Sequence, residues 1–337
     1  MKLSYEQIKN VTLGAAYVDV FEENIRFHRF TKEQETLYET VSDNFYNKAF
    51  ANSCVRLEFK TNSSRLFIKA KVTPRSSRRF YSHDVFVDGK LCGSLENSYI
   101  EVEGAIVSKE FILGEKEAEK SVRICLPWSC SSDIIELSID DGATLIPIKK
   151  DIKMLCYGDS ITQGYDAMST SNSYASKLTT ELNAETRNKG IGGEIFRPEL
   201  ARLKDDGFQP SIITIAYGTN DWGTEISKDA FVKRVNDFFE AVVKNYPNAK
   251  VFVIAPIWRA DWQDIHTFGE FKQIKEELLK AANKHSGITL IDGFDFVPKE
   301  TELFSDKYLH PNDEGFEYYA KNLINELKNT SKKLMPT

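Results

Sequence analysis

Residues 154–164 read MLCYGDSITQG, and this stretch decides the class of fold. A short apolar run, Met154–Tyr157, is followed at once by glycine and polar residues, as in a buried parallel strand that ends at a functional loop. Gly158 and Gly164 allow the backbone to approach a ligand closely. Ser160 therefore stands where a sheet of this kind exposes a reactive side chain.

Compact apolar strands and long amphipathic helices alternate along the rest of this half of the chain. The expected strands are Ile212–Tyr217, Val251–Ile254 and Ile288–Ile291. Helices are expected from Ser227 to about Pro247, over about 268–284 and over about 313–327. The alternation predicts an α/β domain in three layers, α/β/α, whose parallel sheet is covered on both faces.

The first half of the chain shows a different pattern, in which apolar and polar residues alternate with period two. Val55–Lys60 and Leu66–Val72 alternate in this way around a turn-like link and predict a hairpin, and Asp88-Gly89 predicts a second hairpin turn. One short helix is expected near Lys32–Thr40. We therefore expect an all-β sandwich, jelly-roll-like, at residues 1–148 and a catalytic domain at 149–337.

Composition excludes several classes of function. The 337 residues carry 44 Lys and Arg against 50 Asp and Glu, a net charge of −6, with no basic block. Binding to nucleic acid or to a membrane surface is therefore not expected. The N-terminus lacks the apolar segment of a secretory signal, and the five cysteines do not form a metal-binding pattern. A cytoplasmic location with reduced thiols and no metal is expected.

Three polar side chains have the types that nucleophilic catalysis needs. A serine hydroxyl is a weak nucleophile until a base takes its proton, and histidine is the usual base near neutral pH. A third group must hold the imidazole in the right tautomer. Ser160, His310 and Asp306 supply these types in an order compatible with a triad. As alternatives without a catalytic role, Ser160 could simply cap a helix, and His310 could simply precede one.

The negative oxygen formed during acyl transfer needs fixed hydrogen-bond donors. Asn220 follows an expected strand in the run Tyr217–Asp221, so its amide could point into the same crevice. The glycine-rich segment Asn188–Gly193 offers backbone N–H groups. These residues could also be ordinary turn residues.

Four motifs together resemble the SGNH (GDSL-type) hydrolase family. They are Gly158-Asp159-Ser160, Asn188–Gly193, Gly218-Thr219-Asn220-Asp221 and His310-Pro311. The resemblance covers about residues 153–327. It implies Ser160 as nucleophile, His310 as base, and an oxyanion hole made by the Ser160 N–H, a glycine N–H and the Asn220 amide. Aligning the glycine motif places that glycine at Gly193, with Gly192 as the alternative.

The acid departs from the family pattern in its spacing. The family usually places it three residues before the histidine, where this chain has Lys307, whereas Asp306 lies four before. A bulge in the loop could absorb the extra residue, so Asp306 is the expected orienting acid. In some related esterases a backbone carbonyl takes this role, and that alternative stays open.

A sandwich placed before an SGNH domain is similar to the layout of two-domain carbohydrate acetylesterases. The resemblance implies removal of acetyl groups from saccharides, with a small acetylated mono- or oligosaccharide as substrate and no cofactor. Trp258 and Trp222 follow expected strands and are candidate platforms for a sugar ring. The alternatives are a general short-chain esterase or lysophospholipase-like acylhydrolase, and a catalytically dead carbohydrate-binding protein.

Overall fold

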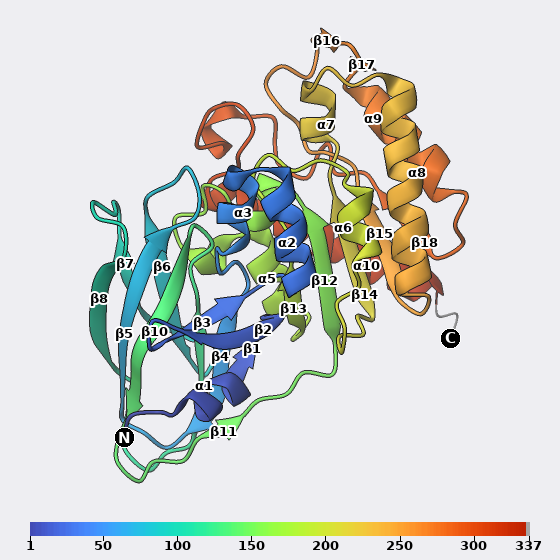
Figure 1. Ribbon diagram of the computed structural model, residues 1–337. Coiled ribbons are helices and arrows are strands. Elements are labelled where there is room, and N and C mark those ends of the chain that lie inside the picture. Colours follow the sequence, from blue (N-terminus) through green and yellow to red (C-terminus); the bar gives the residue numbers. More distant parts are fainter. Residues whose placement is uncertain (335–337) are drawn as a thin grey trace. The chain divides into compact units, whose positions relative to one another are not determined.

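The computed structural model describes residues 1–334, with side chains described as far as Thr330 (Figure 1). The chain divides into two compact units. The first contains Met1–Asp151, Met168–Ser171 and Glu185–Arg187, and the second contains Ile152–Ala167, Asn172–Ala184 and the chain from Asn188 on. The main segment of the first unit thus ends at Asp151, and two short segments farther along the chain also belong to this unit.

The first unit is a β-sandwich of two antiparallel sheets. One sheet has the order β1-β4-β9-β6-β7, with β11 paired to β4, and the other has the order β2-β3-β10-β5-β8. Inward-facing residues of both sheets form one core, including Leu57 and Val122 from the first sheet and Ile68 and Leu137 from the second. The strands are β1 (Thr12–Leu13), β2 (Tyr17–Phe21), β3 (Asn24–His28), β4 (Arg56–Thr61), β5 (Arg65–Pro74), β6 (Tyr81–Val87), β7 (Lys90–Asn97), β8 (Ala105–Ile112), β9 (Lys120–Cys125), β10 (Cys130–Ile139) and β11 (Ile146–Pro147).

One of the two predicted hairpins in this unit is wrong. The segments expected to pair across residues 61–64 are β4 and β5, which belong to different sheets. Period two shows which side chains are buried, but it does not show which neighbour a strand pairs with. The hairpin at Asp88-Gly89 is confirmed by the antiparallel pair β6–β7, and both turn residues have positive φ.

Three helices lie in the first unit: α1 (Tyr5–Val11), α2 (Lys32–Val41) and α3 (Asp43–Ala49). Only α2 was expected from the sequence. The caps explain the starts of the other two, since the side chains of Ser4 and Ser42 accept hydrogen bonds from the backbone N–H groups of Gln7 and Phe45.

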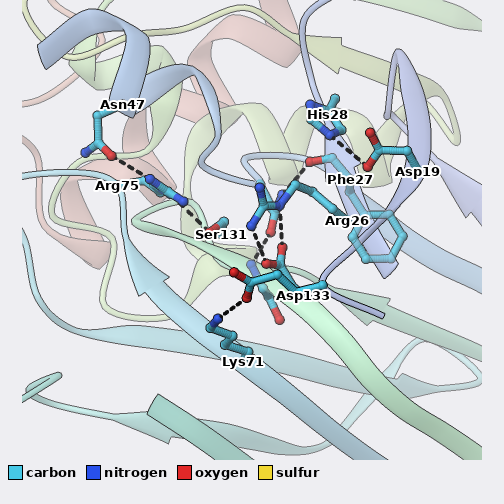
Figure 2. A network of polar contacts seen from close by, with 12 residues as sticks. Asp19, Arg26, Phe27, His28, Asn47, Lys71, Arg75, Ser131 and Asp133 are labelled. Carbon is cyan, nitrogen blue, oxygen red and sulfur yellow. Dashed lines mark hydrogen bonds and ion pairs between the residues drawn. The ribbon is translucent and has the colours of Figure 1, made fainter. Parts of the chain in front are cut away.

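A polar network covers part of the second sheet on the face away from the core (Figure 2). Arg26 on β3 forms a bidentate pair with Asp133 on β10, at 3.0 and 2.6 Å. Arg75 donates to Asn47 and Ser131, as Figure 2 also shows. Because its neighbour Ile134 points into the core, the alternation along β10 places Asp133 on the opposite face.

The second unit is built on a parallel sheet in which β12, β14, β15 and β18 are neighbours in that order. Successive side chains of β12 lie near different helices. The ring centroid of Tyr157 lies 5.3 Å from that of Phe238 on α8, whereas Cys156 is close enough to Tyr174 on α5 to contribute to the raised pKa of that tyrosine. Helices therefore cover both faces of the sheet, and the predicted three-layer α/β/α class is confirmed. Within residues 1–334, no helix has both the length and the hydropathy that crossing a bilayer requires.

The remaining elements begin with β12 (Lys153–Gly158), α4 (Ser160–Gln163), η1 (Thr170–Asn172), α5 (Tyr174–Glu181), β13 (Glu185–Asn188), α6 (Pro198–Arg202), β14 (Ile212–Ala216) and α7 (Thr219–Gly223). They continue with α8 (Lys228–Asn245), β15 (Lys250–Ile254), β16 (Ile265–His266), β17 (Gly269–Glu270), α9 (Lys272–Ala282), β18 (Ile288–Ile291), η2 (Thr301–Leu303) and α10 (Asp313–Leu334). In Figure 1, α8 and α9 lie side by side, as their contacts confirm.

Candidate active site

Ser160 is the first residue of the short helix α4, directly after β12. Asp159 caps this helix by accepting a hydrogen bond from the N–H of Ile161 at 3.0 Å. Gly158 is required here, because a Cβ at this position would lie 2.0 Å from the hydroxyl of Thr162. The tight turn from strand to helix places Ser160 at the carboxyl edge of the sheet, where it is 4% exposed.

A continuous chain of hydrogen bonds joins Ser160 to His310 and Asp306. The hydroxyl of Ser160 lies 2.8 Å from Nε2 of His310, and Nδ1 of His310 lies 2.6 Å from Oδ2 of Asp306. Because an ionised carboxylate can only accept, Nδ1 carries the proton and Nε2 is left to accept from the serine hydroxyl. This tautomer is the one that a general base for the serine needs.

The loop before α10 accommodates the unusual spacing of the acid. Oδ1 of Asp306 accepts the backbone N–H groups of Tyr308, Leu309 and His310 at 2.9, 2.8 and 3.0 Å. Lys307, the residue at the family's usual acid position, takes a φ of +57° and pairs with Glu302 through its side chain. The extra residue is thus absorbed in a tight turn, and a carboxylate oxygen, not a backbone carbonyl, faces Nδ1.

Three carboxylates near the serine have different environments. Partial burial acts to raise the pKa of Asp306, but the hydrogen bonds from the ring and N–H of His310 and from the N–H of Leu309 outweigh it and hold the pKa well below its ordinary value. Burial raises the pKa of Asp159 to about 7. Asp166 lies 4.0 Å from Nδ1 of His310 and is 5% exposed, although nothing in the sequence singled it out.

The structure separates the two glycines that could serve the oxyanion hole. The N–H of Gly192 donates to Oε1 of Gln163 at 2.8 Å and is therefore occupied. Gly193, with φ +89°, is exposed, and its N–H makes no hydrogen bond to any residue among those described. The side chain of Asn188 holds this loop against α4, because its amide donates to the carbonyl of Thr162 at 2.7 Å.

Asn220 lies in α7, directly after β14, the neighbour of β12 in the sheet. Its amide nitrogen donates one hydrogen bond to the carbonyl of Glu194 at 2.9 Å. A side-chain amide has two N–H bonds, so a second one remains for another acceptor. Asp221, which could have been a turn residue, is buried and accepts the N–H of Phe196, and burial raises its pKa to about 7.

The two tryptophans do not lie as expected for sugar platforms. Trp222 is 0% exposed and donates from its indole to the carbonyl of Gly269 at 2.9 Å, so its expected role in binding a sugar is wrong: a fully buried ring has no free face. Trp258 is 8% exposed and contacts Phe304 at 5.1 Å, which leaves little of its surface for a ligand. Like Asp166, the neighbouring Arg259 was not indicated by any motif, although it is buried and makes hydrogen bonds to Thr219, Asp261 and Tyr308.

Two groups of side chains among the described residues have the spacing of metal ligands. One consists of Asp166, Asp306 and His310, and the other of Asp261, Asp264 and His266. In the first group Asp306 already accepts from His310, and in the second Asp261 is paired with Arg259. Carboxylates with these partners do not form a ready cation site.

The fold and this geometry define an α/β protein with a Ser–His–Asp array at the carboxyl edge of its sheet. Residues 156–318 match the model of the GDSL-like lipase/acylhydrolase family, in agreement with the family that the motifs predicted. No protein with a curated description matches the chain by sequence.

Solved structures share the fold over most of the chain. A salicylyl-acyltransferase from a tetracycline biosynthetic pathway is 21% identical, with a TM-score of 0.82, over 95% of this chain and 94% of that one. A family two carbohydrate esterase from Cellvibrio japonicus is 14% identical, with a TM-score of 0.68, over 99% of both chains. An acetyl xylan esterase from Butyrivibrio proteoclasticus is 17% identical, with a TM-score of 0.59, over 82% of this chain and 90% of that one. The two-domain arrangement is thus shared with carbohydrate esterases.

Proposed function

We propose that the chain is a serine esterase that cleaves short-chain acyl esters through an acyl-enzyme. The observation that carries the proposal is the unbroken relay from Ser160 through His310 to Asp306, with distances of 2.8 and 2.6 Å. The match to the GDSL-like lipase/acylhydrolase family supports ester chemistry. In this proposal the family resemblance gives the class of reaction, and the relay gives each residue its role.

The proposed reaction begins when the Ser160 oxygen attacks the ester carbonyl and Nε2 of His310 takes the hydroxyl proton. The imidazolium that forms is stabilised by the charge of Asp306. The carbonyl oxygen becomes negative and accepts from the N–H groups of Ser160 and Gly193 and from the amide of Asn220. His310 then returns the proton to the leaving alcohol, which departs as the C–O bond breaks.

In the second half of the reaction a water molecule takes the place of the alcohol. His310 accepts a proton from the water, whose oxygen attacks the acyl carbon, and the same donors hold the new oxyanion. Collapse of this intermediate breaks the bond to Ser160, which regains its proton from His310. Every proton and charge in the scheme is handled by a named group of the chain.

The proposed substrate is a small acetylated saccharide. The carbohydrate esterase from C. japonicus and the acetyl xylan esterase from B. proteoclasticus support this substrate class. The likeness to the salicylyl-acyltransferase favours a second candidate, in which the acyl group passes to an alcohol instead of water. Both candidates share the acyl-enzyme and differ only in what attacks it.

Two measurements test the proposal. A fluorophosphonate probe should label the wild-type protein at one site and should not label Ser160→Ala, and absence of labelling would favour a carbohydrate-binding protein without activity. Nitrophenyl acetate, butyrate and octanoate should be compared with peracetylated xylose. Activity that rises with acyl length would discard the saccharide substrate in favour of a lysophospholipase-like one, and product that appears only with an added alcohol would favour acyl transfer.

A further inference from the structure

A single buried arginine lies between the two loops that carry the proposed oxyanion donor and the proposed base. Arg259 follows β15 and is 7% exposed. All five of its N–H bonds have acceptors. Nη1 donates to the carbonyl and hydroxyl of Thr219 at 2.9 and 3.1 Å, Nη2 donates to the hydroxyl of Tyr308 at 2.8 Å, and Nε and Nη2 form a bidentate pair with Asp261 at 2.5 and 2.9 Å.

On one side, Arg259 holds the peptide group that carries Asn220. The Thr219 carbonyl belongs to the peptide unit whose nitrogen is that of Asn220, so the bond from Nη1 fixes the orientation of this unit. Helix α7 has only five residues and follows Gly218, whose φ is +118°. So short a helix has few backbone hydrogen bonds of its own, and it depends on contacts from outside.

On the other side, Arg259 and its neighbours hold the loop that carries His310. Tyr308 lies between Asp306 and His310 in this loop. Its hydroxyl contacts both Arg259 and Asp261, and its carbonyl accepts the N–H of Ala260 at 2.9 Å. The segment 259–261 therefore fixes the loop through both the backbone and a side chain of one residue.

Two further contacts keep the guanidinium rigid. Trp222, the ring excluded above as a sugar platform, faces the guanidinium at 4.9 Å, a distance at which a cation is attracted to an aromatic face. Asp261 compensates the buried charge through a bidentate pair, the strongest of the common charged hydrogen-bond geometries. The planar fork of arginine reaches all these partners at once, which the single ammonium of lysine cannot do.

We propose that Arg259 is a positioning residue that fixes the oxyanion donor Asn220 relative to the base His310. The inference rests on the proposed esterase function, and it adds a residue that touches neither the nucleophile nor the base. Catalysis depends steeply on such geometry, and a displacement of about 1 Å can lower the rate about a hundredfold. Loss of the arginine should therefore lower kcat far more than it raises KM.

The test compares Arg259→Lys and Tyr308→Phe with the wild-type protein, using p-nitrophenyl acetate. We expect Arg259→Lys to lower kcat about 30- to 100-fold with KM changed less than about threefold, and Tyr308→Phe to lower kcat about three- to tenfold. Arg26→Lys is the matched control, because it also breaks a bidentate pair with an aspartate, in the network of Figure 2, and it should retain wild-type kcat.

Chemical rescue distinguishes positioning from a purely structural role. In Arg259→Ala, millimolar guanidinium chloride should restore part of kcat, and the pH at which kcat/KM reaches half its maximum should not move. Two outcomes would overturn this inference but leave the proposed function standing. One is a wild-type kcat in Arg259→Lys. The other is a loss of activity that matches the unfolded fraction seen by circular dichroism and does not respond to guanidinium. A wild-type protein that neither reacts with the fluorophosphonate probe nor turns over esters would overturn the proposed function and this inference with it.

Discussion

The two oxygens of Asp306 have different partners. We therefore expect Asp306→Asn to lose more activity than Asp306→Ala, and Asp306→Ala to lose more stability than Asp306→Asn. Oδ2 faces Nδ1 of His310 at 2.6 Å, whereas Oδ1 accepts three backbone N–H groups at 2.8–3.0 Å. In Asp306→Asn the amide oxygen must take the Oδ1 position, because an NH2 group there would face three donors. The NH2 group then points at His310.

This orientation forces the wrong tautomer on the histidine. An NH2 group facing Nδ1 makes that nitrogen an acceptor, so the ring proton moves to Nε2, which can no longer accept the proton of Ser160. The analogous change in a serine protease triad lowers kcat about 10⁴-fold. We expect a loss of about 10³- to 10⁴-fold here, or about 4–5.5 kcal/mol of barrier. The alanine variant imposes no tautomer and should retain roughly tenfold more activity than the asparagine variant.

Stability should change in the reverse order. Asp306→Asn keeps an acceptor for the three N–H groups, whereas Asp306→Ala removes it and should lower the free energy of unfolding by about 1–3 kcal/mol. The pKa of Asp306 lies below its ordinary value in the folded protein, so its stabilising contribution is present at neutral pH and is lost as the pH falls through the folded pKa. The stability gap between wild type and Asp306→Ala should therefore narrow only below about pH 4.

The assay is kcat/KM for p-nitrophenyl acetate together with urea unfolding of each variant. Asp140→Ala is the matched control, because Asp140 also accepts loop hydrogen bonds, from the N–H and hydroxyl of Ser64 at 2.7 and 2.6 Å, but lies in the first unit. It should lose stability and keep its activity. If Asp306→Asn retains activity within about fivefold of wild type, the tautomer argument is refuted, because the expected loss is at least about 10³-fold.

Three further predictions concern the second unit. Asn220→Ala removes one proposed oxyanion donor and should lower kcat about 10²- to 10³-fold with little change in KM, measured by steady-state kinetics. Burial raises the pKa of Asp221 to about 7, so ionisation of this group destabilises the fold as the pH rises from about 4 to 7. The melting temperature, measured by calorimetry, should therefore fall less between pH 5 and pH 8 in Asp221→Asn than in the wild type. Phe238 is buried against Tyr157 and Phe196, so Phe238→Ala should lower the free energy of unfolding, measured in urea, by about 3–5 kcal/mol. A loss under about 1 kcal/mol would contradict its role in the core.

The sequence predicted the parts of the molecule that have a local pattern. Strand and helix periodicity led to the correct fold class. The motifs around Ser160 and His310 indicated two side chains that are 150 residues apart in the sequence and are hydrogen-bonded in the structure. The pairing of β4 and β5 could not be predicted in this way, because alternation along a strand is the same whichever neighbour it joins.

The sequence could not predict the contacts that hold the site together. Arg259 has no motif, and its partners Thr219 and Tyr308 lie 40 and 49 residues away. Trp222 was considered for a sugar site because exposed and buried tryptophans look alike in a sequence. The N–H of Gly192 is occupied because it donates to Gln163, which lies 29 residues away along the chain. The glycine motif by itself does not show this contact.

Asp159, Asp221 and Asp306 have environments that shift their pKa values in different directions, and this difference supports the proposed role of Asp306. Burial raises the pKa of Asp159 and Asp221 to about 7, so at neutral pH each is protonated in a large fraction of molecules. Asp306 has a lowered pKa and stays ionised. In the proposed reaction an imidazolium formed at His310 needs a fixed negative charge beside it, and Asp306 is the one of these three acids that both contacts the ring and has a lowered pKa.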